Sequence, residues 1–351
     1  MSARAHRASF GGAHMSSAQP FFHTGRNPDH RTGPAAVVQR VLMPRHRLLM
    51  EAMAVGYIVV AAQCDGRHYL FFPGLAALAY DVLTRPWGRW ASQPGRLVLT
   101  PSVGAVAGVW MTRQFPYHFL TVVALVTLCL VIVAALRSTI APAVAAGVLP
   151  LVLGIDSWVY PASIAVSLVV LIGILLPWKR YCRHRYHWAG STSASNLDDI
   201  LEASPGTHAW IVPFYLFVTV MAICAAASGL RLLLFPPLIV IAYAMFAHPR
   251  TCPWAGKPIA LLAACALMST GGWIAVSLWG KGGVAAGGAM VFGIVVLRVL
   301  RFHMPPALAI GLLPLVIGSL SIEFPVAVTI GAAALTFAYL LHRRLTMRST
   351  S

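Results

Sequence analysis

Arg137 and Arg301 are the first residues of this chain with a candidate chemical role, because each opens a copy of one apolar sequence. Residues 137–154 read RSTIAPAVAAGVLPLVLG and residues 301–318 read RFHMPPALAIGLLPLVIG, identical at 10 of 18 positions with an offset of 164. In both copies a proline follows the arginine five residues later. A cation before a helix start favours an anion, since the positive end of the helix dipole lies there too. The alternative is an anchor that reaches lipid phosphate.

The prolines and glycines that follow are the candidate lining of a path for a solute. Proline interrupts the backbone hydrogen-bond ladder, and glycine lets another chain approach closely. A helix that begins at a proline would direct free N–H groups towards whatever lies before it. The alternative is helix packing through small residues. The residues concerned are Pro142, Gly147, Pro150, Pro305, Pro306, Gly311 and Pro314.

A few charged residues and one histidine complete the candidates. Asp156 and Glu323 each lie between the fifth and sixth apolar segments of their half. Acids at membrane depth are usually functional, which favours a vestibule or proton-coupling role, whereas a place at the outer boundary fits ordinary loop acids. His303 has no histidine counterpart 164 residues earlier, and the alternative for it is a plain interfacial residue. Asp81 and Arg85, four residues apart, predict a local ion pair.

A second repeated block shows that the duplication extends over most of the chain. Residues 70–86 read LFFPGLAALAYDVLTRP and residues 233–249 read LLFPPLIVIAYAMFAHP, identical at 7 of 17 positions with an offset of 163. The whole chain is 58% hydrophobic and 10% charged, with a mean hydropathy of +0.76. A soluble domain carries roughly 25% charged residues, so this composition cannot cover a surface in water. An apolar, proline-interrupted duplication is typical of membrane transporters built from two repeats.

Twelve apolar segments predict an all-α, polytopic transmembrane helical bundle of two tandem parallel repeats, with about six segments in each. Several segments are shorter than the roughly 20 residues of a straight span and contain proline, which predicts broken or re-entrant helices. The segments are 48–64, 69–84, 97–112, 118–136, 139–154, 158–178, 209–229, 232–246, 258–279, 285–299, 305–318 and 324–341. The expected divisions are a basic, disordered tail at 1–47, repeat 1 at 48–178, a linker at 179–208, repeat 2 at 209–342 and a tail at 343–351.

The basic residues predict the orientation. Arginines and lysines concentrate in the N-terminal tail, in the linker and at the C-terminus, and such regions stay in the cytoplasm. With an even number of segments in each repeat, both repeats have the same orientation, related by a pseudo-two-fold axis along the membrane normal. The net charge of +17 is thereby explained without nucleic acid. Residues 193–208 within the linker predict a short amphipathic helix.

No pattern indicates a cofactor, a metal or an enzyme. The nine acids are scattered, and neither a zinc-binding spacing nor a phosphate-binding loop is present. The cysteines lack CxxC spacing and are expected to be buried apolar side chains rather than disulfides or metal ligands. They are Cys64, Cys129, Cys182, Cys224, Cys252 and Cys265.

Residues 71–94 and 302–318 resemble the HPP family of integral membrane proteins. Ser92-Gln93-Pro94 stands for the Ala-Gln-Pro element of that family. Met304-Pro305-Pro306-Ala307 stands for its His-Pro-Pro-Ala element, with Met304 in place of the family's histidine. The resemblance implies passage of a small anion such as nitrite, with Gln93 and two prolines of the second repeated block, Pro73 and Pro236, added to the path. A different repeat family, such as the aromatic-acid exporters, is the alternative.

The sequence therefore predicts a multi-pass plasma-membrane transporter or channel for a small solute, with an anion favoured. Its expected partners are the lipid bilayer and that solute, with a homo-oligomer left open. The alternatives are a membrane-embedded enzyme that acts on lipid, which would need converging acids or histidines, and a non-catalytic membrane subunit.

Overall fold

The structure, a computed structural model, describes residues 34–64, 71–186, 208–249, 252, 254–301, 303–318 and 321–348. The chain divides into two units, residues 1–44 and 45–351, and the side-chain contacts described below lie within the second. Every regular element in the described residues is helical, which confirms the predicted all-α class. The elements are α1 (Pro34–Gln63), α2 (Gly74–Thr84), α3 (Pro94–Gln114), α4 (Phe119–Ala135), α5 (Pro142–Leu153), α6 (Val159–Tyr186), α8 (Ile211–Ser228), η1 (Arg231–Leu234), α9 (Pro236–Ala247), α10 (Pro258–Trp279), α11 (Gly283–Val299), α12 (Pro305–Leu312), η2 (Leu313–Leu315) and α13 (Glu323–Arg348).

Each of the twelve predicted apolar segments overlaps one of the α-helices, but some boundaries were predicted wrongly. The tail was expected to run to residue 47, whereas α1 already begins at Pro34. The linker was expected from residue 179, whereas α6 continues through the basic run to Tyr186. Both errors have one cause, because a helix can continue past its apolar stretch into polar residues. The helix predicted at 193–208 lies outside the described residues.

Proline and glycine account for most of the observed boundaries. Helices α3, α5, α9, α10 and α12 each carry a proline in the first turn, where the missing N–H costs nothing. Helices α5 and α8 end at Gly154 and Gly229, both in the left-handed conformation that glycine adopts without strain.

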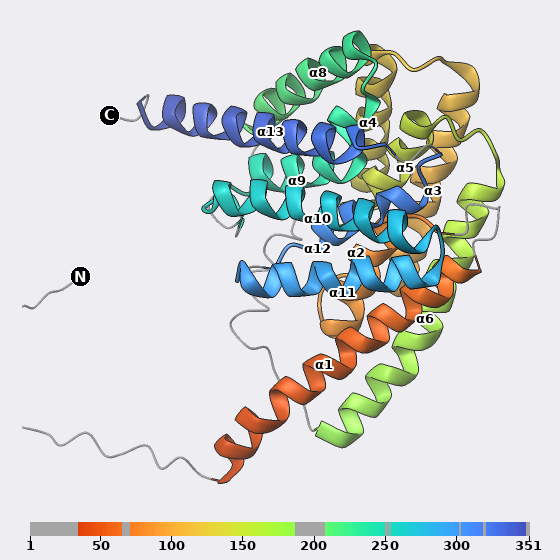
Figure 1. Cartoon of the computed structure of the whole chain (residues 1–351), viewed down its shortest axis with the longest axis vertical. Helices are drawn as coiled ribbons and strands as arrows, with labels where there is room; N and C mark the ends of the chain where they lie inside the picture. The colour runs from red at the N-terminus through yellow and green to blue at the C-terminus, as the bar shows by residue number, and fades with distance from the viewer. Residues whose placement is uncertain are drawn as a thin grey trace, which may run out of the picture. The chain divides into compact units, whose positions relative to one another are not determined.

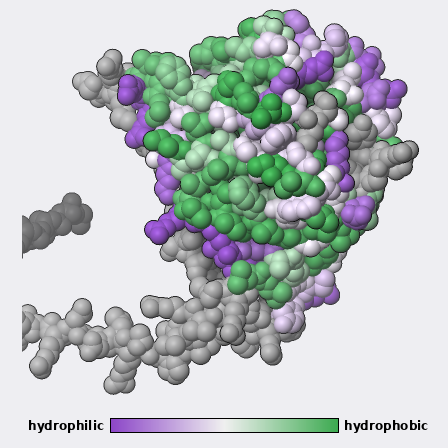
Figure 2. Space-filling view, viewed as in Figure 1, coloured by the Kyte–Doolittle hydropathy of each residue, from purple (hydrophilic) through white to green (hydrophobic). Residues whose placement is uncertain are grey.

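Four helices among the described residues are long and apolar enough to cross a membrane: Val159–Tyr181, Ile211–Ser228, Pro258–Trp279 and Glu323–Leu345. Large apolar side chains are exposed along them, and Figure 2 shows hydrophobic residues over much of the visible face. Soluble monomers rarely expose apolar surface so continuously. These helices indicate a membrane protein. Examples of the exposed side chains are Val212, Leu216, Ile259, Leu278 and Phe337.

Long helices enclose short ones. In Figure 1, α10, α11 and α13 lie side by side, and α1 lies beside α6, where the Tyr57 hydroxyl donates to the Ser167 carbonyl at 2.6 Å. Helices α2, α5, α9 and α12 are only 11, 12, 12 and 8 residues long, and nearly all their residues are buried. Their contacts join the two halves of the chain in equivalent ways. Helix α2 of the first half packs on α12 of the second, and α5 of the first half packs on α9 of the second. The core of the molecule is therefore made of helices from both halves of the chain.

Two glycine pairs allow the closest approaches in this core. Helix α5 packs on α3 where Gly108 faces the Gly147 backbone, and α12 packs on α10 where Gly272 faces the Gly311 backbone. In each pair a Cβ on the first glycine would overlap the carbonyl oxygen of the second. Only glycine fits at these two contacts.

Candidate functional site

Arg137 and Arg301 share an unusual backbone conformation. Their φ angles are 48° and 53°, and no other non-glycine residue in the described part of the chain has a positive φ. Each lies just after a helix end, that of α4 or α11, in a position usually taken by glycine. A left-handed non-glycine residue costs about 1–2 kcal/mol. Both side chains are exposed, so the structure gives no packing reason for arginine at either position.

The helix starts that follow do not supply the free N–H donors expected from the sequence. In α5, Pro142 has no N–H, and the next two amides already donate to the carbonyls of Ile140 and Ala141 at 3.1 and 3.0 Å. In α12, the first two residues are prolines, and the next amide, from Ala307, donates to Met304 at 3.0 Å. The helix dipoles remain, but hydrogen bonds to an anion would have to come from side chains.

The candidate lining residues are all buried in helix contacts. Gly147 and Gly311 make the close approaches described above, which the packing alternative explains. The prolines of the repeated sequence lie in α5, in the first turn of α12 and in η2. Pro73 immediately precedes α2, and Pro236 begins α9. The buried prolines are Pro73, Pro142, Pro150, Pro236, Pro305, Pro306 and Pro314.

Asp156 and Glu323 are exposed, the first in the loop before α6 and the second as the first residue of α13. This placement fits the loop-acid alternative better than a coupling role. Gln93 lies before α3 and accepts a hydrogen bond from the Arg96 guanidinium at 3.1 Å. No described contact brings Asp156, Glu323 or Gln93 close to Arg137 or Arg301.

A different group of residues does form a buried constellation, which we call the acid–base cluster. It lies where α1, α2 and α11 meet the start of α12. Its two acids are almost inaccessible, with Glu51 4% and Asp81 1% exposed. Buried acids are stable only when they are paired. The members of the acid–base cluster are Arg47, Glu51, Tyr80, Asp81, Arg85, Arg298 and His303.

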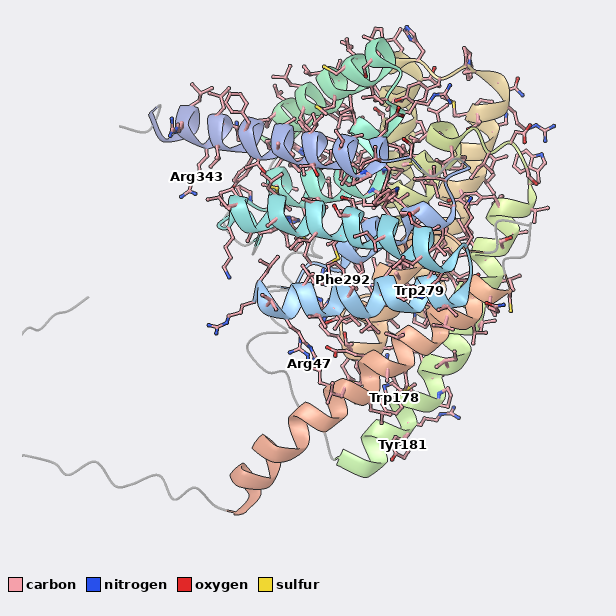
Figure 3. All side chains as sticks on the ribbon, in the orientation of Figure 1. Arg47, Trp178, Tyr181, Trp279, Phe292 and Arg343 are labelled. Atoms are coloured by element: carbon pink, nitrogen blue, oxygen red, sulfur yellow. The ribbon has the colours of Figure 1, made fainter. Side chains whose placement is uncertain are left out.

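Glu51 ties α1 to α2 and α11. Its Oε1 accepts from Arg47 Nε at 3.1 Å and lies 3.5 Å from the Tyr80 hydroxyl, while its Oε2 pairs with Arg298 of α11. The Arg47 and Arg298 side chains are 60% and 40% exposed, so both can reach solvent or lipid headgroups. Figure 3 labels Arg47 on α1 near α11. Glu51 therefore holds two partly exposed cations together from within the protein.

Asp81 ties α2 to the start of α12. Its Oδ1 accepts from Arg85 Nη2 at 2.6 Å and Nε at 2.9 Å, which confirms the predicted ion pair, and lies 3.3 Å from His303 Nε2. Its Oδ2 is buried and has no hydrogen-bond partner among the described residues. The His303 imidazole stacks on the Tyr80 ring, with centroids 5.6 Å apart. His303 and Tyr80 together thus link Asp81 to Glu51, since Tyr80 also faces Glu51.

Sequence reasoning singled out Asp81, Arg85 and His303 but missed Glu51, Arg298 and Tyr80. One signal was present, because Glu51 is an acid inside an apolar segment, and such acids are usually paired and functional. Its pairing with Arg298, 247 residues away, follows only from the fold.

The described cysteines are free thiols, and no group of three potential metal ligands occurs among the described residues. Cys129, Cys252 and Cys265 are buried as predicted, but Cys64 and Cys224 are exposed, which corrects the expectation for those two. Burial raises the pKa of the Cys252 thiol, in the loop before α10, to about 12. It therefore stays protonated at neutral pH and is not a reactive thiolate.

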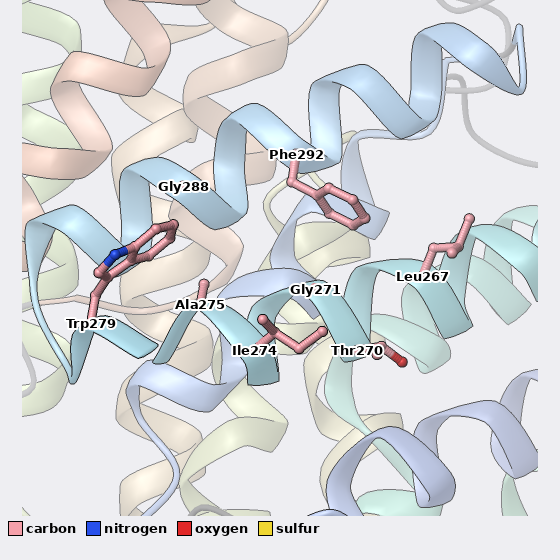
Figure 4. A pocket seen from close by; sticks show the side chains of 8 residues that line it. All are labelled: Leu267, Thr270, Gly271, Ile274, Ala275, Trp279, Gly288 and Phe292. Atoms are coloured by element: carbon pink, nitrogen blue, oxygen red, sulfur yellow. The ribbon is translucent and has the colours of Figure 1, made fainter. Parts of the chain in front are cut away.

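An apolar groove of about 330 Å³ lies between α10 and α11 (Figure 4). Phe292 covers Gly271 and Trp279 covers Gly288, so each helix places an aromatic ring on a glycine of the other. Thr270 is the one polar residue in the lining. The groove offers no acid or base and is not part of the acid–base cluster.

No protein-family model matches the chain, and no curated protein or solved structure matches it. The resemblance to the HPP family therefore stays a prediction that rests on the motifs quoted above. The class that the fold itself supports is an all-helical protein with four apolar helices able to cross a membrane.

Proposed function

We propose that this chain is a multi-pass plasma-membrane transporter or channel for a small solute, with an anion as the favoured substrate class. The observation that carries the proposal is the set of short, buried helices α2, α5, α9 and α12. At about 1.5 Å per residue they are roughly 12–18 Å long, about half the roughly 30 Å of a hydrocarbon core. Helices that stop within the bilayer persist only inside protein or around a cavity, and they mark solute sites in many transporters.

We further propose that the two halves are parallel repeats related by a pseudo-two-fold axis along the membrane normal. Support comes from the matching order of long and short helices before and after the linker. Arg137 and Arg301 adopt the same rare conformation 164 residues apart. The contacts Gly108–Gly147 and Gly272–Gly311 recur with the same offset. The contacts of α2 with α12 and of α5 with α9 each join a short helix of one half to a short helix of the other. Two subunits that packed in this way and later became fused would retain these contacts.

An anion is favoured because cations collect around the helix starts. Arg137 precedes α5 and Arg301 precedes α12, where Lys257 donates to the Arg301 carbonyl at 3.3 Å. Since the first-turn amides are already bonded, these side chains would attract the anion through charge rather than through backbone donors. Nitrite is the case to test first, on the basis of the HPP resemblance.

The topology predicts which cysteines an impermeant reagent reaches. Cys64, exposed at the end of α1, should lie at the outer surface and react with a charged maleimide added to intact cells. Cysteines introduced as Ser193→Cys and Ser351→Cys in a Cys64→Ser background should react only after permeabilisation. Labelling of either introduced cysteine from outside would reject the proposed orientation.

Substitution of both arginines should lower anion flux without loss of stability. Arg137→Gly/Arg301→Gly removes two cations and relieves the left-handed strain, so the melting temperature in detergent should rise. Nitrite uptake into proteoliposomes at low ionic strength should fall by at least about threefold, and less at high salt. Arg137→Lys/Arg301→Lys, which keeps both charges, is the matched control and should keep most of the flux.

Wild-type protein that moves none of nitrite, nitrate and chloride above the rate of protein-free vesicles would contradict the anion proposal. Equal flux for the glycine, lysine and wild-type proteins at every salt concentration would show that the two arginines are lipid anchors.

A further inference from the structure

Apart from Arg85, which corresponds to His248 at an offset of 163, no charged member of the acid–base cluster has a charged or basic counterpart in the other half of the chain. At an offset of 163, Arg47, Glu51 and Tyr80 correspond to Trp210, Phe214 and Tyr243. Those three rings contact one another, with centroids 5.1 to 6.1 Å apart. The corresponding places in the two halves are therefore held together in two different ways, one by charge and the other by aromatic packing. An aromatic cluster suffices for packing, so packing alone does not require the charges.

Asp81 and His303 likewise occur at only one of the two equivalent helix junctions. Asp81 corresponds to Ala244 at an offset of 163, and His303 corresponds to Thr139 at an offset of 164. An apolar residue and a small hydroxyl therefore serve at the equivalent helix junction. The cost of burying Asp81 is incurred only where α2 meets the start of α12.

The Asp81 carboxylate is unevenly bonded. Arg85 and His303 both contact Oδ1, and Oδ2 has no partner among the described residues although it is buried. A buried carboxylate oxygen without a donor is costly. An additional positive charge nearby offsets part of this cost. His303 is placed to supply it, because its Nε2 lies 3.3 Å from the carboxylate and its side chain is 22% exposed.

The other charged groups around His303 are paired with each other. Arg85 shares Asp81 with it, while Arg47 and Arg298 are occupied by Glu51. Tyr80 stacks on the imidazole and separates it from Glu51. Lys257, at the start of α10, contacts the Arg301 carbonyl in the same loop as His303. His303 is thus the one histidine among the members of the acid–base cluster, and imidazole is the side chain that ordinarily exchanges a proton near neutral pH.

We propose that His303 and Asp81 form a proton-binding site that fastens α2 to the start of α12. The proton comes from water, through the exposed part of the imidazole, and binds at a ring nitrogen of His303. The imidazolium then donates from Nε2 to Asp81 Oδ1, and the two opposite charges hold the halves together at this junction. Loss of the proton returns it to water and removes the positive charge, which loosens α2 from α12. One consequence of this inference, faster flux at higher pH, rests on the proposed transport function.

The first measurement does not depend on transport. The melting temperature of the purified full-length protein in detergent is measured at pH 6 and pH 8. Protonated His303 stabilises the folded state, so the wild type should gain stability at pH 6 relative to a variant without the histidine. His303→Thr, which installs the residue found at position 139, should reduce the difference between pH 6 and pH 8 by about 2 °C. Asp81→Asn should do the same.

The second measurement is nitrite uptake into proteoliposomes at both pH values. The rate in protein-free vesicles is subtracted, because undissociated acid crosses bilayers on its own. Wild-type protein should be about fivefold faster at pH 8 than at pH 6, whereas His303→Thr should show the same rate at both.

The outcomes separate the two proposals. A pH effect on melting that is the same in wild type, His303→Thr and Asp81→Asn overturns the proton-binding site, whatever the flux. If the pH effect on melting disappears in both variants and no protein shows flux, the site stands and the transport function fails. Should flux occur with the same pH dependence in wild type and His303→Thr, transport stands and the control of flux by this site is overturned.

Discussion

Gly108→Ala and Gly272→Ala should each destabilise the protein more than a single methyl group added to any other glycine that the structure describes. The new Cβ would overlap the carbonyl oxygen of Gly147 or Gly311, so α3 and α5, or α10 and α12, would have to move apart. Backbone cannot rotate away as a flexible side chain can, and overpacking of this kind costs about 3 kcal/mol or more. A loss of roughly 5 °C or more in melting temperature is expected.

Gly173→Ala provides the matched control. Gly173 lies inside helix α6, and a Cβ there would meet no heavy atom within 4 Å. Alanine in a helix interior is favoured over glycine by about 0.5–1 kcal/mol, so this variant should melt slightly higher than the wild type. If Gly108→Ala and Gly272→Ala had the same melting temperature as Gly173→Ala, the close contacts at the two glycine pairs would not exist.

Glu51→Gln should produce the second large effect. Glu51 is the only acid that contacts Arg47 and Arg298 in the described residues, and its removal leaves both guanidinium groups facing an uncharged side chain at a buried position. Glu51 is buried but both arginines are partly exposed, so water screens the two ion pairs and the loss should be about 1–2 kcal/mol. The melting temperature should therefore fall by several degrees, and α1 should separate from α11 more readily, which limited proteolysis would detect.

The chain itself supplies the control for Glu51. The triple variant Arg47→Trp/Glu51→Phe/Arg298→Ala copies the residues at the corresponding positions of the other half, Trp210, Phe214 and Ala134. No charge is then left without its partner, and replacing a buried ion pair by packed apolar groups is often neutral. The triple variant should regain most of the stability that Glu51→Gln loses. Equal melting of wild type and Glu51→Gln would show that Glu51 does not hold the two arginines.

The sequence predicts the helices well because each lies in an apolar run bounded by proline, glycine or charge. It also predicts the Asp81–Arg85 pair, because residues four apart face each other on a helix. The partner of Glu51 could not be predicted, since hydropathy does not tell which helix of one half lies beside which helix of the other. The left-handed backbone at Arg137 and Arg301 was also hidden, because arginine is not the residue that usually marks that conformation.

The error about free amide donors has a local cause. The prolines that mark the starts of α5 and α12 also remove N–H groups, and a tight first turn bonds the next amides to the loop carbonyls. A proline at a helix start therefore predicts the position of the dipole but not the presence of donors. In the proposed anion path, cationic side chains such as Arg137 and Arg301 would have to supply the attraction instead.

The packing of short helices of one half on short helices of the other also constrains biosynthesis. The packing partner of α2 is α12, which begins at Pro305 and emerges from the ribosome long after Thr84. At a synthesis rate of ~5–20 residues per second, roughly 220 intervening residues require about 10 to 45 seconds. During that time α2 has no α12 to cover it, although it is too short to span the bilayer. The nascent first half must therefore be shielded until the second half arrives, by the insertion machinery or by other helices of its own half.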